Sequence, residues 1–420
     1  MTHADTTVFV NAAEIVTVAG PPRGRRGAEM SDAGVLRECG VAVRDGRFVM
    51  LGHDDELWRA FPGATIVDCG RGLLTPGLVD SHTHAVFGAG RFAEHELRAT
   101  GVPYAEIARR GGGIHASVRD VRGRSDAELI ALAVPRMQRI LASGVTTVEV
   151  KSGYGLSLED ELKLLRVIRA LTRRLPCRIV ATFMGAHEIP LEARARERGR
   201  EEYIRTVTHE MIPAVASEGL AQFADVFCEP GVYTVSETRT ILEAARAHGL
   251  GLKLHADELE QSGGAELAAE LGAMSADHLA AISDRGVAAL AASETVATLL
   301  PATMLFLGRD ARAPARRLME QGAAVALATD FNPGSSPLTN IGVVMSLGVS
   351  LLGMRVAEAL VATTVNGAAA LGLASETGQI APGFDADLAL WDAHDHRELA
   401  YWFGERLCRA SWARGKPCHH

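Results

Sequence analysis

Short apolar runs recur along the middle of this chain, and longer segments with helical spacing of apolar residues separate them. Eight such runs predict β-strands: the segment from Leu74 to the His-x-His at 82–84, and residues 145–150, 178–184, 225–228, 251–255, 275–279, 296–300 and 325–329. Strands that alternate with helices are typical of a parallel sheet in which each crossover connection is a helix.

Several of the predicted helices have recognisable ends. Ser125 followed by Glu128 is a capping box that begins a helix, and Gly144 is placed to end it. Thr234 with Glu237 repeats the capping pattern. Eight strand–helix units over roughly 290 residues match the (β/α)₈ (TIM) barrel, whose usual size is about 250 residues plus insertions. A doubly wound open sheet is the alternative.

Both ends of the chain have patterns typical of β-strands without intervening helices. Residues 40–51 contain an Asp45-Gly46 turn between two strand-like runs, which predicts a hairpin. Residues 378–391 return to the same texture near the C-terminus. We therefore predict a small β-sandwich domain built from residues 1–73 and 371–420, and an α/β barrel domain over residues 74–370.

Polar residues stand at the predicted carboxyl ends of the strands, where the active site of such a barrel lies. These residues are His82, His84, His187, His255, His278 and Asp330. His82 and His84 are two positions apart, so a strand directs both imidazoles to one face. We predict a metal site of His82, His84, His255 and Asp330; satisfied core histidines are the alternative.

Three imidazoles and one carboxylate suit Zn or Fe, with a coordination position left for water. A metal in such a site lowers the pKa of bound water and polarises a carbonyl oxygen. Two-metal sites often need a bridging residue, for which a carbamylated lysine on the fourth strand is one solution, but this strand ends Val226-Phe227-Cys228-Glu229 with no lysine. We expect one metal ion, and Glu229 leaves a bridged pair open.

Other side chains near the strand ends suit acid–base chemistry or substrate binding. Glu258 lies three positions beyond His255, where a carboxylate can transfer a proton or bind substrate. His187 and His278 are outside the four-ligand set and can orient substrate or move protons. Arg91 follows the His-x-His and suits a substrate carboxylate, and Tyr154 lies in another loop that should overhang the site.

Composition and charge narrow the class of protein. The 420 residues are 47% hydrophobic and 22% charged, with a formal net charge of -8 and no basic tract, so we expect no nucleic-acid partner. No apolar run reaches the roughly 18 residues of a membrane span, and the N-terminus has no secretory signal pattern. The six scattered cysteines predict reduced thiols in a cytoplasmic protein.

Six segments resemble the amidohydrolase superfamily and, more narrowly, the imidazolonepropionase family of histidine degradation. They are residues 80–88, 111–116, 149–156, 182–187, 255–258 and 328–334. The resemblance spans essentially the whole chain. The His-x-His and the final Asp330 are typical of the superfamily, whereas the segments around Tyr154, His187 and Asn332 are specific to the narrower family.

The resemblance implies a metal-dependent hydrolase that opens the ring lactam of 4-imidazolone-5-propanoate to N-formimidoyl-L-glutamate, and a homodimer. It implies the metal ligands already named and places His278 near the reacting water. The substrate-binding residues that it implies are Arg91, Tyr154, His187, Glu258, Asn332, Gly334 and Ser335. Either His278 or Glu258 would act as the base. An aminohydrolase of a nucleobase-like ring and a non-catalytic scaffold are the alternatives.

Overall fold

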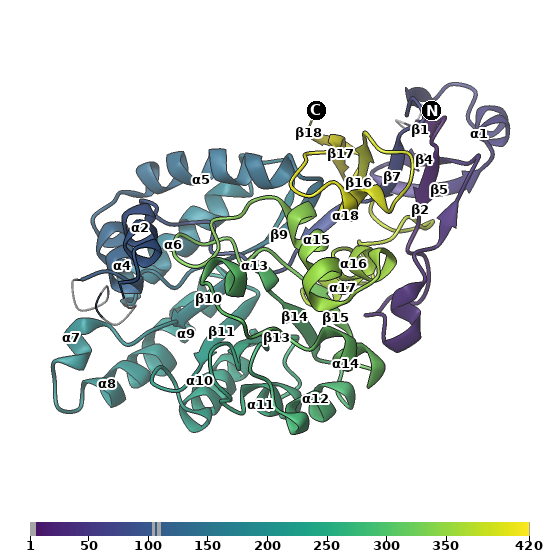
Figure 1. Ribbon diagram of the computed structural model, residues 1–420. Helices are drawn as coiled ribbons and strands as arrows, with labels where there is room; N and C mark the ends of the chain where they lie inside the picture. Colours follow the sequence, from purple (N-terminus) through teal and green to yellow (C-terminus); the bar gives the residue numbers. More distant parts are fainter. Residues whose placement is uncertain (1–5, 103–105, 107–110, 420) are drawn as a thin grey trace.

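The centre of the molecule is a sheet of eight parallel strands that follow one another in chain order (Figure 1). The computed structural model describes residues 6–102, 106 and 111–419. The strands of this sheet are β8 (Leu78–Asp80), β9 (Val145–Lys151), β10 (Arg178–Ala186), β11 (Phe223–Cys228), β12 (Gly251–Ala256), β13 (Ser275–His278), β14 (Val296–Leu299) and β15 (Val325–Leu327). Seven predicted strands are confirmed, with ends that differ by at most two residues.

The prediction of one strand from Leu74 toward the His-x-His is wrong in one respect: the segment forms two strands that belong to different sheets. β7 (Leu73–Pro76) pairs with β16 (Leu388–Trp391), whereas β8 pairs with β9 in the barrel. Gly77 joins them, and a Cβ atom there would collide with the Thr146 side chain. The sheets can therefore approach this closely only where the connecting residue has no side chain.

Helices surround the barrel strands (Figure 1). They are α2 (Phe92–Ala99), α4 (Ile114–Arg122), α5 (Asp126–Leu141), α6 (Leu158–Leu171), α7 (Leu191–Arg194), α8 (Gly199–Thr206), η2 (Val207–Met211), α9 (Ile212–Ser217), α10 (Val235–Ala247), α11 (Gly264–Glu270), α12 (Asp284–Ala291), α13 (Pro301–Phe306), α14 (Ala315–Glu320), α15 (Ile341–Leu352), α16 (Val356–Ala362) and α17 (Val365–Ala369). The two predicted capping boxes are confirmed: Ser125 and Thr234 accept hydrogen bonds at the starts of α5 and α10.

β8 and β15 are the first and last strands of the eight-stranded sheet, and hydrogen bonds connect β8 to the segments that follow β15. At their carboxyl ends, the Asp80 carboxylate accepts hydrogen bonds from the Thr329 backbone N–H at 3.0 Å and from the Thr329 hydroxyl at 2.6 Å. The backbone N–H of Val79, in the middle of β8, donates to the carbonyl of Thr363, at the end of α16. These bonds bring the residues that follow β15 beside those that follow β8.

The two ends of the chain form two further sheets. One sheet has the order β5-β4-β1-β6 and the other has the order β18-β17-β16-β7-β2-β3. Further elements here are β1 (Thr6–Val10), β2 (Glu14–Val16), β3 (Val35–Leu36), β4 (Gly40–Arg44), β5 (Arg47–Gly52), α1 (Asp54–Ala60), β6 (Thr65–Asp68), β17 (Cys408–Ala413) and β18 (Lys416–His419). Two short helices from the chain ends contact the barrel helices instead: η1 (Gly27–Ser31) packs against α14 and α16, and α18 (Glu398–Tyr401) packs against α15.

Apolar side chains from the two sheets pack together. Phe9 of β1 meets Trp412 of β17 edge-on, with ring centroids 4.9 Å apart. This packing confirms the predicted β-sandwich, and β4 with β5 confirms the hairpin around Asp45-Gly46. Within the described residues, no helix is both long enough and apolar enough to cross a bilayer.

Candidate metal centre and active site

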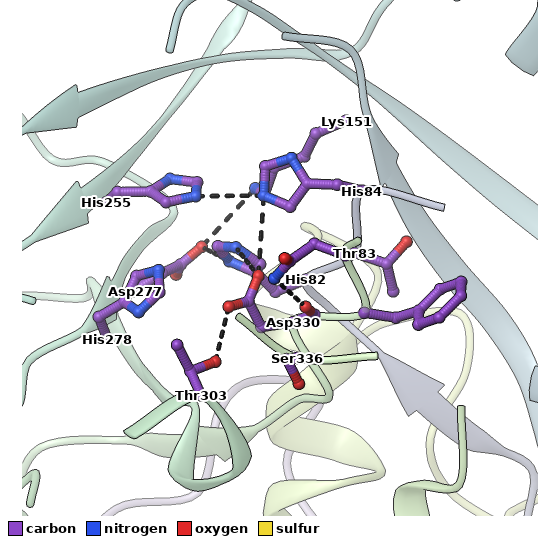
Figure 2. A network of polar contacts seen from close by, with 12 residues as sticks. His82, Thr83, His84, Lys151, His255, Asp277, His278, Thr303, Asp330 and Ser336 are labelled. Atoms are coloured by element: carbon purple, nitrogen blue, oxygen red, sulfur yellow. Dashed lines mark hydrogen bonds and ion pairs between the residues drawn. The ribbon is translucent and has the colours of Figure 1, made fainter. Parts of the chain in front are cut away.

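Four side chains from three strand ends converge at one point (Figure 2). His82 and His84 follow β8, His255 lies on β12, and Asp330 follows β15. The His84 and His255 Nε2 atoms are 3.3 Å apart, and Asp330 Oδ1 lies 3.5 Å from His82 Nε2 and 3.8 Å from His84 Nε2. The predicted ligands therefore face one another.

The chemistry of these atoms fits a metal ion. His82 Nε2 is buried and has no hydrogen-bond partner among the described residues. Burial lowers the pKa of both His82 and His84 well below the ordinary value, which keeps the imidazoles neutral. Zinc and iron bind the neutral imidazole through a nitrogen that is not engaged in a hydrogen bond, and the nearby carboxylate oxygen can bind the same ion.

Two buried carboxylates hold the ligand imidazoles in orientation. Asp277 Oδ2 lies 2.6 Å from His82 Nδ1, and Asp225 Oδ1 lies 3.0 Å from His255 Nδ1. Each contact engages Nδ1 and leaves Nε2 directed toward the centre. Carboxylates that bind the second nitrogen of a metal-ligating histidine fix its tautomer and raise its basicity.

Lys151 links these two carboxylates, and its Nζ atom lies 3.7 Å from Asp277 Oδ2. Its Nζ atom lies 2.7 Å from Asp225 Oδ2 and 2.8 Å from Glu149 Oε2, and all three side chains are fully buried. Burial alone would lower the pKa of Lys151, but the neighbouring Asp225, Glu149 and Asp277 raise it above the ordinary value. The ammonium therefore stays charged and balances the carboxylates that orient the histidines.

Asp330 has a partner of its own. The Thr303 hydroxyl, on α13, donates to Asp330 Oδ2 at 2.6 Å (Figure 2). The Asp330 backbone has a φ of 51°, and that of His278 has a φ of 80°. Residues other than glycine rarely adopt this left-handed region, and such strain is concentrated at functional sites.

A cavity of about 560 Å³ opens above these ligands at the carboxyl ends of the strands. Its lining includes the side chains predicted for substrate binding and proton transfer: Arg91, Tyr154, His187, Glu258, His278, Asn332, Gly334 and Ser335. The tertiary structure thus brings together residues that are up to 244 positions apart in the chain, Arg91 and Ser335.

Arg91 is seated between two loops. It precedes α2, and its backbone N–H faces the Pro333 carbonyl at 3.4 Å. Its guanidinium lies against Gly334, where a Cβ atom would collide with it. Arg98, on α2, donates to the Gly334 carbonyl at 3.1 Å. The absence of a side chain at position 334 therefore makes room for the Arg91 guanidinium.

His187 packs against a metal-ligand candidate. Its ring stacks on that of His84, with centroids 5.0 Å apart and an interplanar angle of 20°. His187 Nδ1 lies 3.0 Å from the Gly153 carbonyl, so this nitrogen is the donor and Nε2 remains an acceptor. Burial lowers the pKa of His187 to about 3, and Tyr154, also buried, has a raised pKa.

Glu258 and His278 face each other at the edge of the ligand cluster. Glu258 Oε2 lies 3.6 Å from His278 Nε2. Burial raises the pKa of Glu258 well above its ordinary value and lowers that of His278 well below. His278 also lies close enough to His82 and His255 to share an ion with them. The two candidate proton carriers are thus adjacent to each other and to the ligands.

The family of the chain follows from comparison with known proteins. Residues 73–413 match the model of the amidohydrolase family. An imidazolonepropionase of Symbiobacterium thermophilum is 48% identical over 97% of this chain and 96% of that protein. One of Bacillus velezensis is 44% identical over 98% and 96%. The chain belongs to the amidohydrolase family, in its imidazolonepropionase branch. The resemblance noted in the sequence is confirmed.

Solved structures agree with this amidohydrolase in fold. An adenosine deaminase of Xanthomonas campestris with bound zinc has a TM-score of 0.74 at 19% identity, over 99% of this chain and 92% of that one. A 5-methylcytosine deaminase of Klebsiella pneumoniae has a TM-score of 0.72 at 18% identity, over 98% and 97%. At such low identity these likenesses show the barrel fold alone.

Asn332, a predicted substrate-binding residue, and Glu229, considered as a possible bridging ligand, both hold the backbone of loops at the site. Asn332 Oδ1 accepts from the backbone N–H groups of Gly334 and Ser335, and its Nδ2 donates to the Asp330 carbonyl. Glu229 accepts from the backbone N–H groups of residues 258–260. Asn332 therefore shapes the loop that carries Asp330, and Glu229 shapes the loop that carries Glu258.

Asp225, Asp277 and Thr303 are parts of this site that were not predicted from the sequence. Asp225 carried a signal, because it is a carboxylate inside the otherwise apolar strand 223–228, a costly position unless it is paired. Asp277 carried a weaker one, since it directly precedes His278 in a predicted barrel strand. Thr303 carried none, since threonine is common in helices and its partner lies 27 residues away.

Proposed function

We propose that this chain hydrolyses the ring lactam of 4-imidazolone-5-propanoate to N-formimidoyl-L-glutamate, a step of histidine degradation. The observation that carries the proposal is identity of 41–48% to several imidazolonepropionases over nearly the whole chain. The cavity supports it, because the Arg91 guanidinium lines the same cavity as His84, His255 and Asp330, and His82 lies beside them. A substrate with one carboxylate and one lactam needs both features.

The proposed metal ligands are His82, His84, His255 and Asp330, with one Zn or Fe ion as the cofactor. Such an ion supplies Lewis acidity, which favours ionisation of water and polarises the lactam carbonyl. Asp277 and Asp225 keep the Nε2 atoms of His82 and His255 directed into the site. Asp330 contributes one oxygen toward His82 and His84.

Arg91 would anchor the propionate of the substrate by charge-assisted hydrogen bonds. Its guanidinium can donate two parallel bonds to a carboxylate, which fixes the position of the ring as well as its affinity. Tyr154 and His187 would flank the ring on one side. Asn332, Gly334 and Ser335 form the loop against which the guanidinium rests, and Glu258 completes the set at the reacting side.

In the reaction, the oxygen of water joins the carbonyl carbon and the C–N bond of the lactam breaks. One proton leaves the water and one proton reaches the departing nitrogen. A single side chain, or two adjacent ones, can carry out both proton transfers. His278 and Glu258 lie 3.6 Å apart at this place. We propose that His278 accepts the proton and that Glu258 binds or protonates the nitrogen.

Turnover assays with verified metal content test this function. We expect hydrolysis of 4-imidazolone-5-propanoate and no deamination of guanine, with about one metal ion per chain. His255→Ala should lose both metal and turnover, because it removes one of four protein ligands. Deamination of guanine without lactam hydrolysis would favour the nucleobase aminohydrolase, and full activity of metal-free protein would refute the ligand assignment.

We also propose a cytoplasmic homodimer. The resemblance to imidazolonepropionases motivates the dimer, and one surface supports it. Tyr401, Trp402 and Phe403 are consecutive aromatic side chains with 73%, 48% and 61% of their surface exposed. Beside them is a hollow of about 610 Å³ whose lining includes Val349 and Val356. Exposed aromatic clusters of this kind are typical of protein interfaces.

A further inference from the structure

We infer that Thr303 is a positioning residue for the metal centre: its hydroxyl fixes the Asp330 carboxylate so that one oxygen faces the ligand histidines. The inference rests on the metal site proposed above, but it concerns the affinity for metal and does not depend on the substrate. Thr303 lies on α13, which follows β14, and so comes from a different βα unit than any of the four ligands.

The geometry separates the roles of the two carboxylate oxygens. Asp330 Oδ1 lies within 3.5 Å of His82 Nε2 and 3.8 Å of His84 Nε2. Asp330 Oδ2 accepts the hydrogen bond from Thr303 Oγ1 at 2.6 Å (Figure 2). Thr303 is fully buried and Asp330 is 2% exposed, so water does not readily replace this donor.

The backbone of Asp330 is held independently of Thr303. Its N–H donates to the His82 carbonyl at 3.0 Å, and its carbonyl accepts from Asn332 Nδ2 at 2.7 Å. The position of the Cα atom is therefore set by backbone and loop contacts, while rotation of the carboxylate is restrained by the Thr303 hydroxyl. Removing that hydroxyl should disturb the direction of one ligand and leave the loop in place.

The neighbouring side chain Thr298 provides a matched control. It lies on β14, is fully buried, and its hydroxyl has no hydrogen-bond partner among the described residues. A threonine-to-valine change at 298 or 303 exchanges the same groups at equal volume. Only the change at 303 removes a hydrogen bond to a ligand, so the difference between the two variants isolates that bond.

The test is the dissociation constant for Zn²⁺, measured by competition with a chromophoric chelator on the full chain after metal removal. Thr303→Val should weaken binding about 10- to 100-fold, the usual effect of losing a partner of a metal ligand. Thr303→Ser, which keeps the hydroxyl, should restore affinity to near that of the unmodified chain, and Thr298→Val should leave it unchanged. Circular dichroism and thermal unfolding check that each variant is folded.

Equal affinity in Thr303→Val and the unmodified chain would overturn the inference, and so would an equal loss in Thr303→Val and Thr303→Ser. If Thr303→Val does not fold, the Thr303→Ser and Thr303→Ala pair decides, since only the second lacks the hydroxyl. If the unmodified chain binds no Zn²⁺ or Fe²⁺, the metal centre itself is refuted and the inference falls with it. Metal binding without lactam hydrolysis would refute the proposed substrate and leave the role of Thr303 intact.

Discussion

His278 and Glu258 are the two side chains at the site best placed to move a proton. The imidazole belongs to a buried cluster with His82 and His255, and its Nε2 has no hydrogen-bond partner among the described residues. The carboxylate is buried beside it and has a raised pKa. The lowered pKa of His278 favours an imidazole that can accept a proton, and the raised pKa of Glu258 favours a carboxyl group that can donate one, as in the roles proposed above.

We expect His278→Phe to retain metal and lower kcat by about 10²- to 10⁴-fold, because general-base catalysis typically supplies that factor. Glu258→Gln should lower kcat and also raise KM if it binds the ring N–H. Rate measurements with metal analysis separate the cases, with His248→Phe on the surface as the control. Normal turnover of metal-replete His278→Phe would leave Glu258 as the base, and loss of metal would make His278 a ligand.

Gly334 is the residue on which the proposed carboxylate anchor depends. Because a Cβ atom there would collide with the Arg91 guanidinium, Gly334→Ala should displace the guanidinium without removing its charge. A charge-assisted bond contributes roughly 1.5–3 kcal/mol, so KM should rise on the order of 10- to 100-fold. Arg91→Met should give a similar increase, with metal content unchanged in both.

Steady-state kinetics of Gly334→Ala test this dependence. Gly63→Ala is the matched control, since its Cβ would meet nothing within 4 Å. An unchanged KM in Gly334→Ala would show that Arg91 is anchored elsewhere, and a loss of metal would show that the loop after β15 had been disrupted.

At the scale of elements, the loop between β12 and α11 is shaped by two buried carboxylates. Glu229, after β11, accepts from the N–H groups of residues 258–260. Asp257 accepts from the N–H groups of Ser262, Gly263 and Ala265. These bonds satisfy backbone donors that lie near the start of α11 and hold Glu258 over the cavity.

We therefore expect Glu229→Ala to lower kcat while metal is retained, because three backbone donors lose their acceptor and Glu258 loses its fixed position. The free energy of unfolding should fall by about 1–3 kcal/mol, the cost of leaving buried polar groups unpaired. Denaturant unfolding and kinetics measure the two effects. Glu260→Ala, an exposed position in the same loop, should change neither.

At the scale of the whole molecule, the β-sandwich and the barrel share the segment from β7 through Gly77 to β8. The proposed ligands His82 and His84 therefore directly follow a strand, β8, whose preceding strand β7 is paired in the other sheet. Strand β16, from the far end of the chain, pairs with β7. Both chain ends thus support the first strand of the barrel, which carries half of the predicted metal ligands.

The exposed aromatic cluster of residues 401–403 lies in this same C-terminal region. If it is the dimer interface, Tyr401→Ser combined with Phe403→Ser should convert a dimer to a monomer, because an interface loses affinity when its central aromatic side chains are removed. Light scattering after size-exclusion chromatography measures the mass. Trp58→Ser, an exposed aromatic on α1, should leave the mass unchanged; a variant that stays dimeric would place the interface elsewhere.

The sequence by itself determined the strands, the order of the units and the residues at strand ends. Strand periodicity and the capping boxes at Ser125 and Thr234 are local signals, so they are visible without knowing what packs against them. The His-x-His at 82–84 also needs only the two-residue period of a strand. The segment around Leu74 was misinterpreted as one strand because local pattern does not show that Gly77 lies where the chain passes between two sheets.

Only the tertiary structure decided which side chains form hydrogen bonds to the proposed metal ligands. Asp277 contacts His82 across 195 residues of sequence, and Thr303 contacts Asp330 from helix α13, which belongs to the preceding strand–helix unit. Such contacts depend on the curvature of the barrel and on the rotation of each helix, which no local pattern specifies. The requirement for glycine at position 334 also comes from a residue far away in the sequence, because the Arg91 guanidinium occupies the place of a Cβ atom there.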